Sequence, residues 1–250
     1  MEISKSYKDL TEKILIDDIL INILKYDTIL NLAQHSIISK QFNEIINSES
    51  NSLYECIKIP RELQGCELST YKWMLNKLTK NKIKKLDIID CVDLDIGISI
   101  LKQIKCSDLE TLLIPLAIFA YIDNISDYTS LKRINVRNSH HFSCGVEQTL
   151  AMAENILKLR SLTHLSLGNM KYSNGSFISG ISTPGLVEID LTESVNFNIE
   201  DIDDFLIKNS STLKVLGIDG ETSSEKVLIN CLNKLKLSEL SISNNNIISK

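Results

Sequence analysis

The stretch HHFSC at residues 140–144 carries the densest group of metal-binding and nucleophilic side chains in the sequence. His140, His141 and Cys144 fall within five residues, and imidazole nitrogen and thiolate sulfur are the usual ligands of zinc. A structural zinc site needs four ligands, and no further histidine or cysteine lies nearby in the sequence. We therefore interpret this stretch as a loop and predict no metal site.

Two other stretches have the residue types of binding sites without the required spacing. The acidic EDIDDF at 200–205 lacks the pattern of a calcium loop, and acidic residues suit the first turn of a helix. GIDG at 217–220 fits neither glycine-rich phosphate motif. The chain has four histidines and no nucleophile-elbow pattern. We therefore expect a protein without catalytic residues and without a cofactor.

Composition and charge exclude several classes of protein. The chain has 250 residues, of which 43% are hydrophobic and 24% charged, and this balance is typical of a folded domain. A net charge of -5 argues against a nucleic-acid partner, which calls for a basic surface. No apolar run is long enough for a membrane span, and the six scattered cysteines form no CxxC pair. We expect a reduced protein of the cytoplasm or nucleus, or of the host cytoplasm if the source is viral, and not a secreted one.

A repeated pattern organises the rest of the chain and would have to position any functional residue. Each copy is six residues long, and its first, fourth and sixth residues are apolar. Successive copies start 22 to 31 residues apart, and all their apolar positions are Leu, Ile or Val. The seven copies occupy 83–88, 109–114, 131–136, 162–167, 186–191, 213–218 and 237–242. A candidate eighth, degenerate copy is YECIKI at 54–59.

The pattern predicts a strand in each copy and, in several copies, a helix that returns the chain. The last two apolar residues of a copy are two apart, so they share one face of a strand. Apolar residues three and four apart predict helices over 95–104, 146–160, 199–209 and 224–235. The fold class is therefore α/β, with one strand and one helix per unit. This arrangement resembles the leucine-rich-repeat solenoid, in which stacked units share one core.

We divide the chain into three parts. Residues 1–50 form a small helical segment, and residues 51–82 hold the degenerate copy and a bridging helix around Trp73. Residues 83–250 hold the repeats. The first part has helical periodicity and suggests three short helices, with Asp27 or Thr28 as the cap of the second. Such a small unit buries too little surface to be stable alone, so a partner or the first repeat should complete it.

The stretch from residue 12 to 50 resembles an F-box. The family's pattern begins with Leu-Pro, an acidic pair and Ile-Leu, and the sequence here reads Leu-Ile-Asp-Asp-Ile-Leu at 15–20. A second Ile-Leu, a tyrosine, a Val-Ser-Lys-like Ile-Ser-Lys and an aromatic residue follow in step. Ile16 stands where the family has proline, and His35 where it has leucine. The resemblance assigns adaptor binding to Leu15, Ile16, Ile19, Leu20, Ile23, Leu24, Tyr26, Ile38 and Phe42.

An F-box followed by leucine-rich repeats implies the substrate-recognition subunit of a ubiquitin ligase. The F-box would bind a Skp-family adaptor protein, which is attached to a cullin scaffold, and the repeats would bind an unknown target protein. The subunit itself would catalyse nothing, and would raise the effective concentration of the target near the charged conjugating enzyme. No membrane or nucleic acid is implied.

The residues that flank the last two apolar positions of each copy should face outward and form the target-binding surface. Arg133 and Arg137 give it a basic area, which suits an acidic or phosphorylated segment. Acidic residues predominate further along the chain. The candidate target-binding residues are Lys85, Asp87, Arg133, Asn135, Arg137, His164, Glu188, Asp190, Asp219 and Glu239.

Other interpretations remain open from the sequence alone. The first helices are also compatible with an N-terminal cap on a repeat protein that acts as a stand-alone scaffold or inhibitor. A ligase with its own catalytic cysteine would instead form a thioester at one of the six cysteines. If the protein is viral, it would redirect a host ligase.

Overall fold

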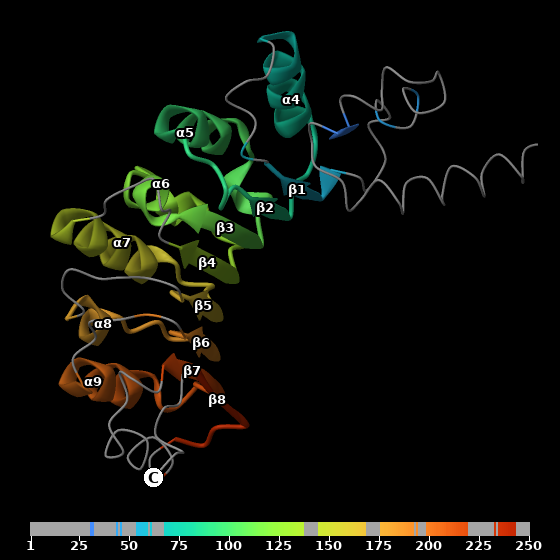
Figure 1. Cartoon of the computed structure of the whole chain (residues 1–250). Coiled ribbons are helices and arrows are strands. Elements are labelled where there is room, and N and C mark those ends of the chain that lie inside the picture. The colour runs from blue at the N-terminus through green and yellow to red at the C-terminus, as the bar shows by residue number, and fades with distance from the viewer. Residues whose placement is uncertain are drawn as a thin grey trace, which may run out of the picture.

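The computed structural model of the chain is an alternating series of strands and helices (Figure 1). It describes residues 31, 32, 44, 46, 54–59, 61, 68–137, 145–168, 176–192, 194, 199–219, 233 and 235–243. The strands are β1 (Cys56–Lys58), β2 (Lys85–Asp87), β3 (Thr111–Pro115), β4 (Arg133–Arg137), β5 (His164–Ser166), β6 (Glu188–Asp190), β7 (Val215–Asp219) and β8 (Glu239–Ser243). The helices are α4 (Leu68–Lys80), α5 (Leu94–Gln103), α6 (Leu116–Ala120), α7 (Val146–Lys158), α8 (Phe177–Gly180) and α9 (Ile199–Asn209), with 3-10 turns η3 (Cys106–Asp108) and η4 (Ile125–Asp127).

The strands form one parallel sheet in which neighbours in space are also neighbours in sequence. Its order is β1-β2-β3-β4-β5-β6-β7-β8. Each strand starts in register with the next, so that Lys85 pairs with Thr111 and Thr111 with Arg133. The predicted α/β array of repeated units is therefore confirmed. The degenerate copy at 54–59 contributes β1, which pairs with β2 in the same way.

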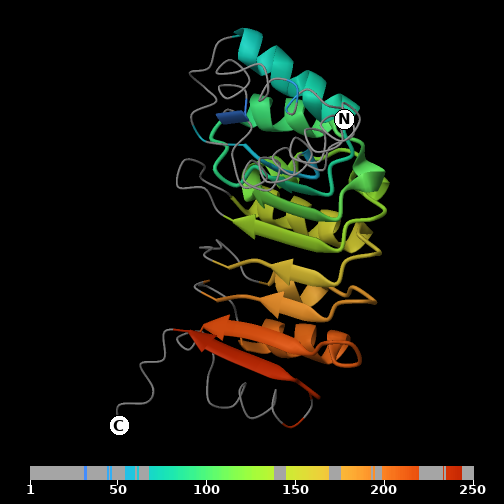
Figure 2. The same ribbon diagram turned by 90° about the vertical axis from the view of Figure 1, so that its right-hand side faces the viewer.

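The described helices lie on one side of the sheet, and no described helix lies on the other side, which we call the open face (Figure 1 and Figure 2). The helices predicted over 95–104, 146–160 and 199–209 are α5, α7 and α9, and α4 lies where the bridging helix is predicted. The helix predicted over 224–235 lies almost entirely outside the described residues. The periodicity did not reveal α6 and α8, because such short helices cannot show a helical period.

Local sequence explains where the predicted helices begin. The Asp93 carboxylate accepts a hydrogen bond from the Ile96 amide at 2.9 Å and thereby caps α5. At the start of α7, the Gly145 amide donates to Gln148 Oε1 at 3.0 Å. The acidic Glu200 and Asp201 occupy the first turn of α9, as expected for EDIDDF.

The apolar residues of the repeat pattern form the core between the sheet and the helices. In the six copies from 83 to 218 every pattern residue is buried, and Ile83 is the most exposed at 3%. Leu237, Leu240 and Ile242 of the last copy are only partly buried. Among the described strands β8 pairs with β7 alone, so one of its edges has no strand beside it.

Two buried asparagines connect neighbouring repeats. The Asn155 amide on α7 donates to the Phe119 carbonyl of α6 at 3.0 Å. On α9, the Asn209 amide donates to the Ile181 carbonyl at 3.2 Å, and its oxygen accepts from the Thr183 amide at 3.3 Å. Because buried polar groups need partners, these bonds to the backbone of the preceding repeat help to fix the spacing of the helices.

The predicted adaptor-binding residues (Leu15, Ile16, Ile19, Leu20, Ile23, Leu24, Tyr26, Ile38 and Phe42) lie outside the described residues. Of that segment the structure describes four residues, and Leu32 and Ile46 are buried in the core that continues into the repeats.

The Ile46 carbonyl connects the first segment of the chain to the array. It accepts hydrogen bonds from the Tyr54 hydroxyl and from Lys77 Nζ, the latter at 3.2 Å. The Lys77 ammonium also lies 5.3 Å from the Tyr54 ring centre and 5.8 Å from that of Trp73, within the range of cation–π attraction. Buried Lys77 therefore holds α4, Tyr54 and residue 46 together.

Candidate functional site

Strand register aligns the residues of the open face in two rows. One row consists of the first residue of every strand, and the other of the third residue. Because all strands are in register, residues of a row lie about 4.8 Å from their neighbours. The first row is Cys56, Lys85, Thr111, Arg133, His164, Glu188, Val215 and Glu239. The second row is Lys58, Asp87, Leu113, Asn135, Ser166, Asp190, Gly217 and Ser241.

The structure brings most of the predicted target-binding residues onto this one face, in different environments. The side chains of Lys85, Arg133, Arg137 and Glu239 are exposed. The partly buried ones are Asp87, Asn135, His164, Glu188 and Asp190. Asp219 lies on β7 in register with Ser243, and its side chain is outside the described part of the structure.

A hollow of about 280 Å³ lies over β2 to β6. Its polar lining consists of Lys85, Thr111, Arg133, Asn135, His164, Ser166 and Glu188. Within the described part of the chain, neither Lys85 nor Arg133 forms an ion pair. By contrast, the adjacent Lys84 and Lys132 pair with Glu55 and Glu110 at 2.9 and 3.1 Å. Among the described residues, the two cations that face the hollow thus have no ion-pair partner and can bind a ligand.

His164 and Glu188 close the hollow on the β6 side. His164 Nε2 lies 3.4 Å from Glu188 Oε2, and its Nδ1 lies 2.7 Å from Thr163 Oγ1. Burial and the Arg133 charge lower the pKa of His164 from 6.5, against the opposing effect of Glu188. The imidazole is therefore harder to protonate than that of an unperturbed histidine, although its Nε2 lies close to the Glu188 carboxylate.

The Asp190 carboxylate forms its hydrogen bonds inside the protein. It accepts from Ser166 Oγ at 3.1 Å, from the Thr192 amide at 3.0 Å and from Thr192 Oγ1 at 2.6 Å. Gly217 beside it leaves the required space, since a Cβ there would lie 2.9 Å from Asp190 Oδ1. Asp87 similarly accepts from the Ile89 amide at 3.2 Å. Within the predicted acidic area, Asp190 therefore stabilises the end of β6 and the turn after it.

The repeat pattern predicts that Thr111 and Ser166 face outward, but neither is among the predicted target-binding residues. In the structure, Thr111 lies between Lys85 and Arg133 in the first row. Asn135 is one of the predicted target-binding residues, and its buried Oδ1 has no hydrogen-bond partner among the described residues. The sequence signal for Thr111 was its position, because it is the third residue of its copy, as Lys85 and Arg133 are of theirs.

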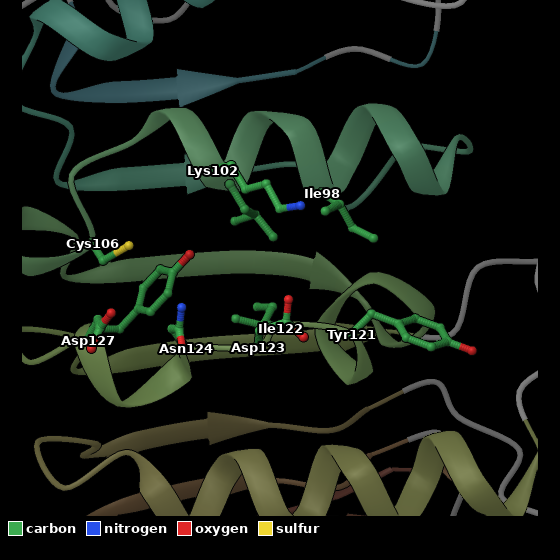
Figure 3. A pocket seen from close by; sticks show the side chains of 10 residues that line it. Ile98, Lys102, Cys106, Tyr121, Ile122, Asp123, Asn124 and Asp127 are labelled. Carbon is green, nitrogen blue, oxygen red and sulfur yellow. The ribbon is translucent and has the colours of Figure 1, made fainter.

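A second hollow of about 240 Å³ lies on the helix side, between α5 and the α6–η4 segment (Figure 3). Ile98 and Lys102 of α5 project toward it, and Cys106 directs its sulfur into the space. Burial raises the pKa of Tyr128 in its lining, so that phenol stays protonated. The charged residues of its lining are of both signs, namely Lys102, Asp123 and Asp127. The hollow therefore does not bring together several donors of one kind.

The structure offers no metal centre in the residues that it describes. No group of three or more His, Cys, Asp or Glu side chains there could hold an ion. The stretch at 140–144, which the sequence analysis weighed as a ligand source, is outside those residues. Among the helices described, none has both the length and the apolar character needed to cross a bilayer.

No protein-family model matches the chain, and no curated protein matches it.

Proposed function

We propose that the chain is the substrate-recognition adaptor of a Skp/cullin/F-box-type ubiquitin ligase. The observation that carries the proposal is the F-box-like pattern from Leu15 to Phe42, followed by a parallel strand-and-helix array. In this proposal the array is a leucine-rich-repeat solenoid. The family usually has asparagine or cysteine at one position past each strand. Cys91, which is buried, and Asn245 fit that position. The other copies have Ala117, Ser139, Met170, Ser194 and Glu221 there, so their turns are irregular.

The proposed mechanism is proximity and not chemistry by the chain itself. The first helices would bind a Skp-family adaptor and through it a cullin scaffold, in the cytoplasm or nucleus. The open face of the sheet would hold the target protein, whose lysines then meet the charged conjugating enzyme at a high effective concentration. The available cations of the hollow support this face as the binding surface.

A second candidate function is a stand-alone repeat scaffold whose first segment is a cap. Its support is the burial of Leu32 and Ile46 in the core of the array, together with the bonds of Tyr54 and Lys77 to the Ile46 carbonyl. A cap and an F-box differ in one measurable property, which is binding to a Skp-family adaptor.

Co-purification with a Skp-family adaptor tests the proposal. Leu20→Asp with Ile23→Asp puts two charges on the predicted apolar face of the first helix. Binding should be lost, because each unpaired buried charge costs several kcal/mol. The matched control is Leu150→Asp with Leu157→Asp on α7, where the two side chains are already 51% and 47% exposed, and this variant should still bind.

Each outcome separates the candidates. Adaptor binding by the wild type and the α7 control, with loss in the first variant and an unchanged circular dichroism spectrum, supports the ligase subunit. If the wild type does not bind any Skp-family adaptor, the first segment is a cap and the scaffold is the better account. A reductant-sensitive ubiquitin adduct on a cysteine would point instead to a ligase with its own catalytic thiol.

A further inference from the structure

The first row of the open face contains a hydroxyl side chain flanked by two cations. Lys85, Thr111 and Arg133 are register partners on β2, β3 and β4. Adjacent strands are about 4.8 Å apart, so the two cations start about 10 Å from each other with Thr111 midway. The long Lys and Arg side chains can therefore both reach a group that sits above Thr111. All three residues line the hollow.

Neither cation forms an ion pair among the described residues. Of the nearby carboxylates, Glu110 pairs with Lys132 at 3.1 Å and Glu188 lies 3.4 Å from His164. Asp87 on β2 accepts a hydrogen bond from the Ile89 amide at 3.2 Å and keeps its negative charge, so two cations and one carboxylate lie nearest to Thr111. Glu188 lies three strands from Thr111. That separation is about 14 Å from the strand spacing. The screening length at physiological salt is only about 8 Å. The position above Thr111 is therefore positive.

The donors match a tetrahedral dianion better than a carboxylate. An arginine alone satisfies both oxygens of a carboxylate through two parallel bonds. A phosphoryl group has three acceptor oxygens and a charge of about -1.5 to -2 at pH 7. Lys85 offers an ammonium, Thr111 a hydroxyl and Arg133 a guanidinium, so each oxygen can have a donor from a different strand.

The surroundings suit a segment of another protein. The hollow is lined by residues of the open face, and its lining includes the partly exposed, apolar Leu113 next to the cations. Arg137 is a further exposed cation at the other end of β4 from Arg133. The rise of a strand places the two arginines about 13 Å apart. An extended chain across this face would therefore meet the phosphate position, an apolar contact and a second positive charge.

We propose that the hollow binds a phosphorylated serine or threonine of the target protein, with the phosphoryl group held by Lys85, Thr111 and Arg133. This proposal rests on the proposed function insofar as it names the ligase's target as a phosphoprotein. The binding site itself does not depend on an adaptor.

The test is binding of the full chain to three fluorescent peptide libraries. Each library has random residues around one fixed position, which is phosphoserine, serine or glutamate. By fluorescence anisotropy, the phosphoserine library should bind at least tenfold more tightly than either of the others. Lys85→Gln and Arg133→Gln should each weaken that binding tenfold or more. Thr111→Val, which keeps the side-chain shape, should weaken it several-fold.

The control variant removes charge elsewhere on the molecule. Arg160→Gln with Lys236→Gln changes two exposed cations outside the hollow, and binding should stay within twofold of the wild type. Equal binding of the phosphoserine and serine libraries, including no binding of either, overturns the proposal. An equal loss in the control variant does so too, because the attraction would then be general.

Two further measurements separate the sources of failure. If inorganic phosphate competes at the same concentration as the phosphoserine library, the hollow is a site for small anions and the phosphoprotein proposal is wrong. Adaptor co-purification is measured on the same variants, and Lys85→Gln and Arg133→Gln should retain it. Phosphoserine selectivity without adaptor binding would leave this site in place and remove only the ligase function.

Discussion

At the scale of single residues, the character of the open face depends on which side chains are bonded internally. Asp190 and Glu188 are occupied by Thr192 and His164, whereas Lys85 and Arg133 have no ion pair among the described residues. A row of outward residues therefore becomes a positive hollow, next to carboxylates whose oxygens contact the protein's own side chains and backbone. The charges nearest to the hollow determine its electrostatic character, and the net charge of -5 does not.

His164 should report these charges through its titration. Its pKa should lie below the usual 6.5, because burial and the Arg133 charge disfavour the imidazolium. Arg133→Gln should raise that pKa, and Glu188→Gln should lower it further. NMR titration of the imidazole, assigned by its absence in His164→Gln, measures all three values.

The same shift has a consequence for stability. The unfolded chain binds the His164 proton more tightly than the folded protein, so the free energy of unfolding should fall as pH drops below about 6.5 toward the folded pKa. In His164→Gln this part of the pH dependence should be absent. A wild-type pKa above 6.5, or shifts of opposite sign in the two charge variants, would contradict the electrostatic description of the hollow.

At the scale of elements, α5 and α6 pack closely at a point where α5 has a glycine. Gly97 on α5 faces Ile118 of α6, and a Cβ at residue 97 would overlap Ile118 Cδ1. Ile118 is completely buried, so its side chain has little room to move. The distance between these two helices is therefore set by the small residue at their contact.

Gly97→Ala should destabilise the protein although alanine favours helices. Overpacking a well-filled core costs about 1–3 kcal/mol, and the gain in helix propensity is about 1 kcal/mol. We expect a net loss of up to about 2 kcal/mol in urea unfolding. Gly180→Ala at the end of α8, where nothing lies within 4 Å of the added Cβ, should cost nothing.

A double-mutant cycle isolates the contact. Ile118→Val removes the Cδ1 atom that the new methyl group would meet. Gly97→Ala with Ile118→Val should therefore be less destabilised than the sum of the single variants by about 0.5 kcal/mol or more. Strict additivity would show that the helices adjust and that glycine is not required at this position.

At the scale of the whole molecule, each repeat is stabilised mainly by its two neighbours. Stability should then depend on position in the array, because an interior strand is covered on both edges. Leu216 of β7 and Leu240 of β8 are register partners at the same point of the pattern. Leu216 is fully buried, whereas Leu240 is only partly buried.

Leu216→Ala should cost about 2–5 kcal/mol, as for a large-to-small change in a packed core. Leu240→Ala should cost less than about 2 kcal/mol, because less apolar surface is lost. Denaturant unfolding measures both, and hydrogen exchange should show faster opening of β8 than of β4. Equal costs for the two variants would mean that the last repeat is as well packed as the interior ones.

Residue spacing was enough to predict the strands, their inward faces and four of the described helices, which are α4, α5, α7 and α9. Strand and helix periodicity are local properties, so Ile83, Leu86 and Ile88 could be assigned to the core from spacing alone. The order of the sheet followed as well, because one repeat cannot bury its apolar face without the next.

Which outward residues can bind a ligand depends on tertiary contacts that the sequence does not show. The repeat pattern places Lys85, Thr111 and Arg133 at the same position of neighbouring copies, and the strand pairing agrees with that register. The sequence could not tell that neither cation forms an ion pair among the described residues. Nor could it tell that Asp190 accepts a hydrogen bond from Ser166 of the preceding strand. A side chain's charge is written in the sequence, but many of its partners come from a neighbouring repeat, and those partners decide whether the charge can bind anything else.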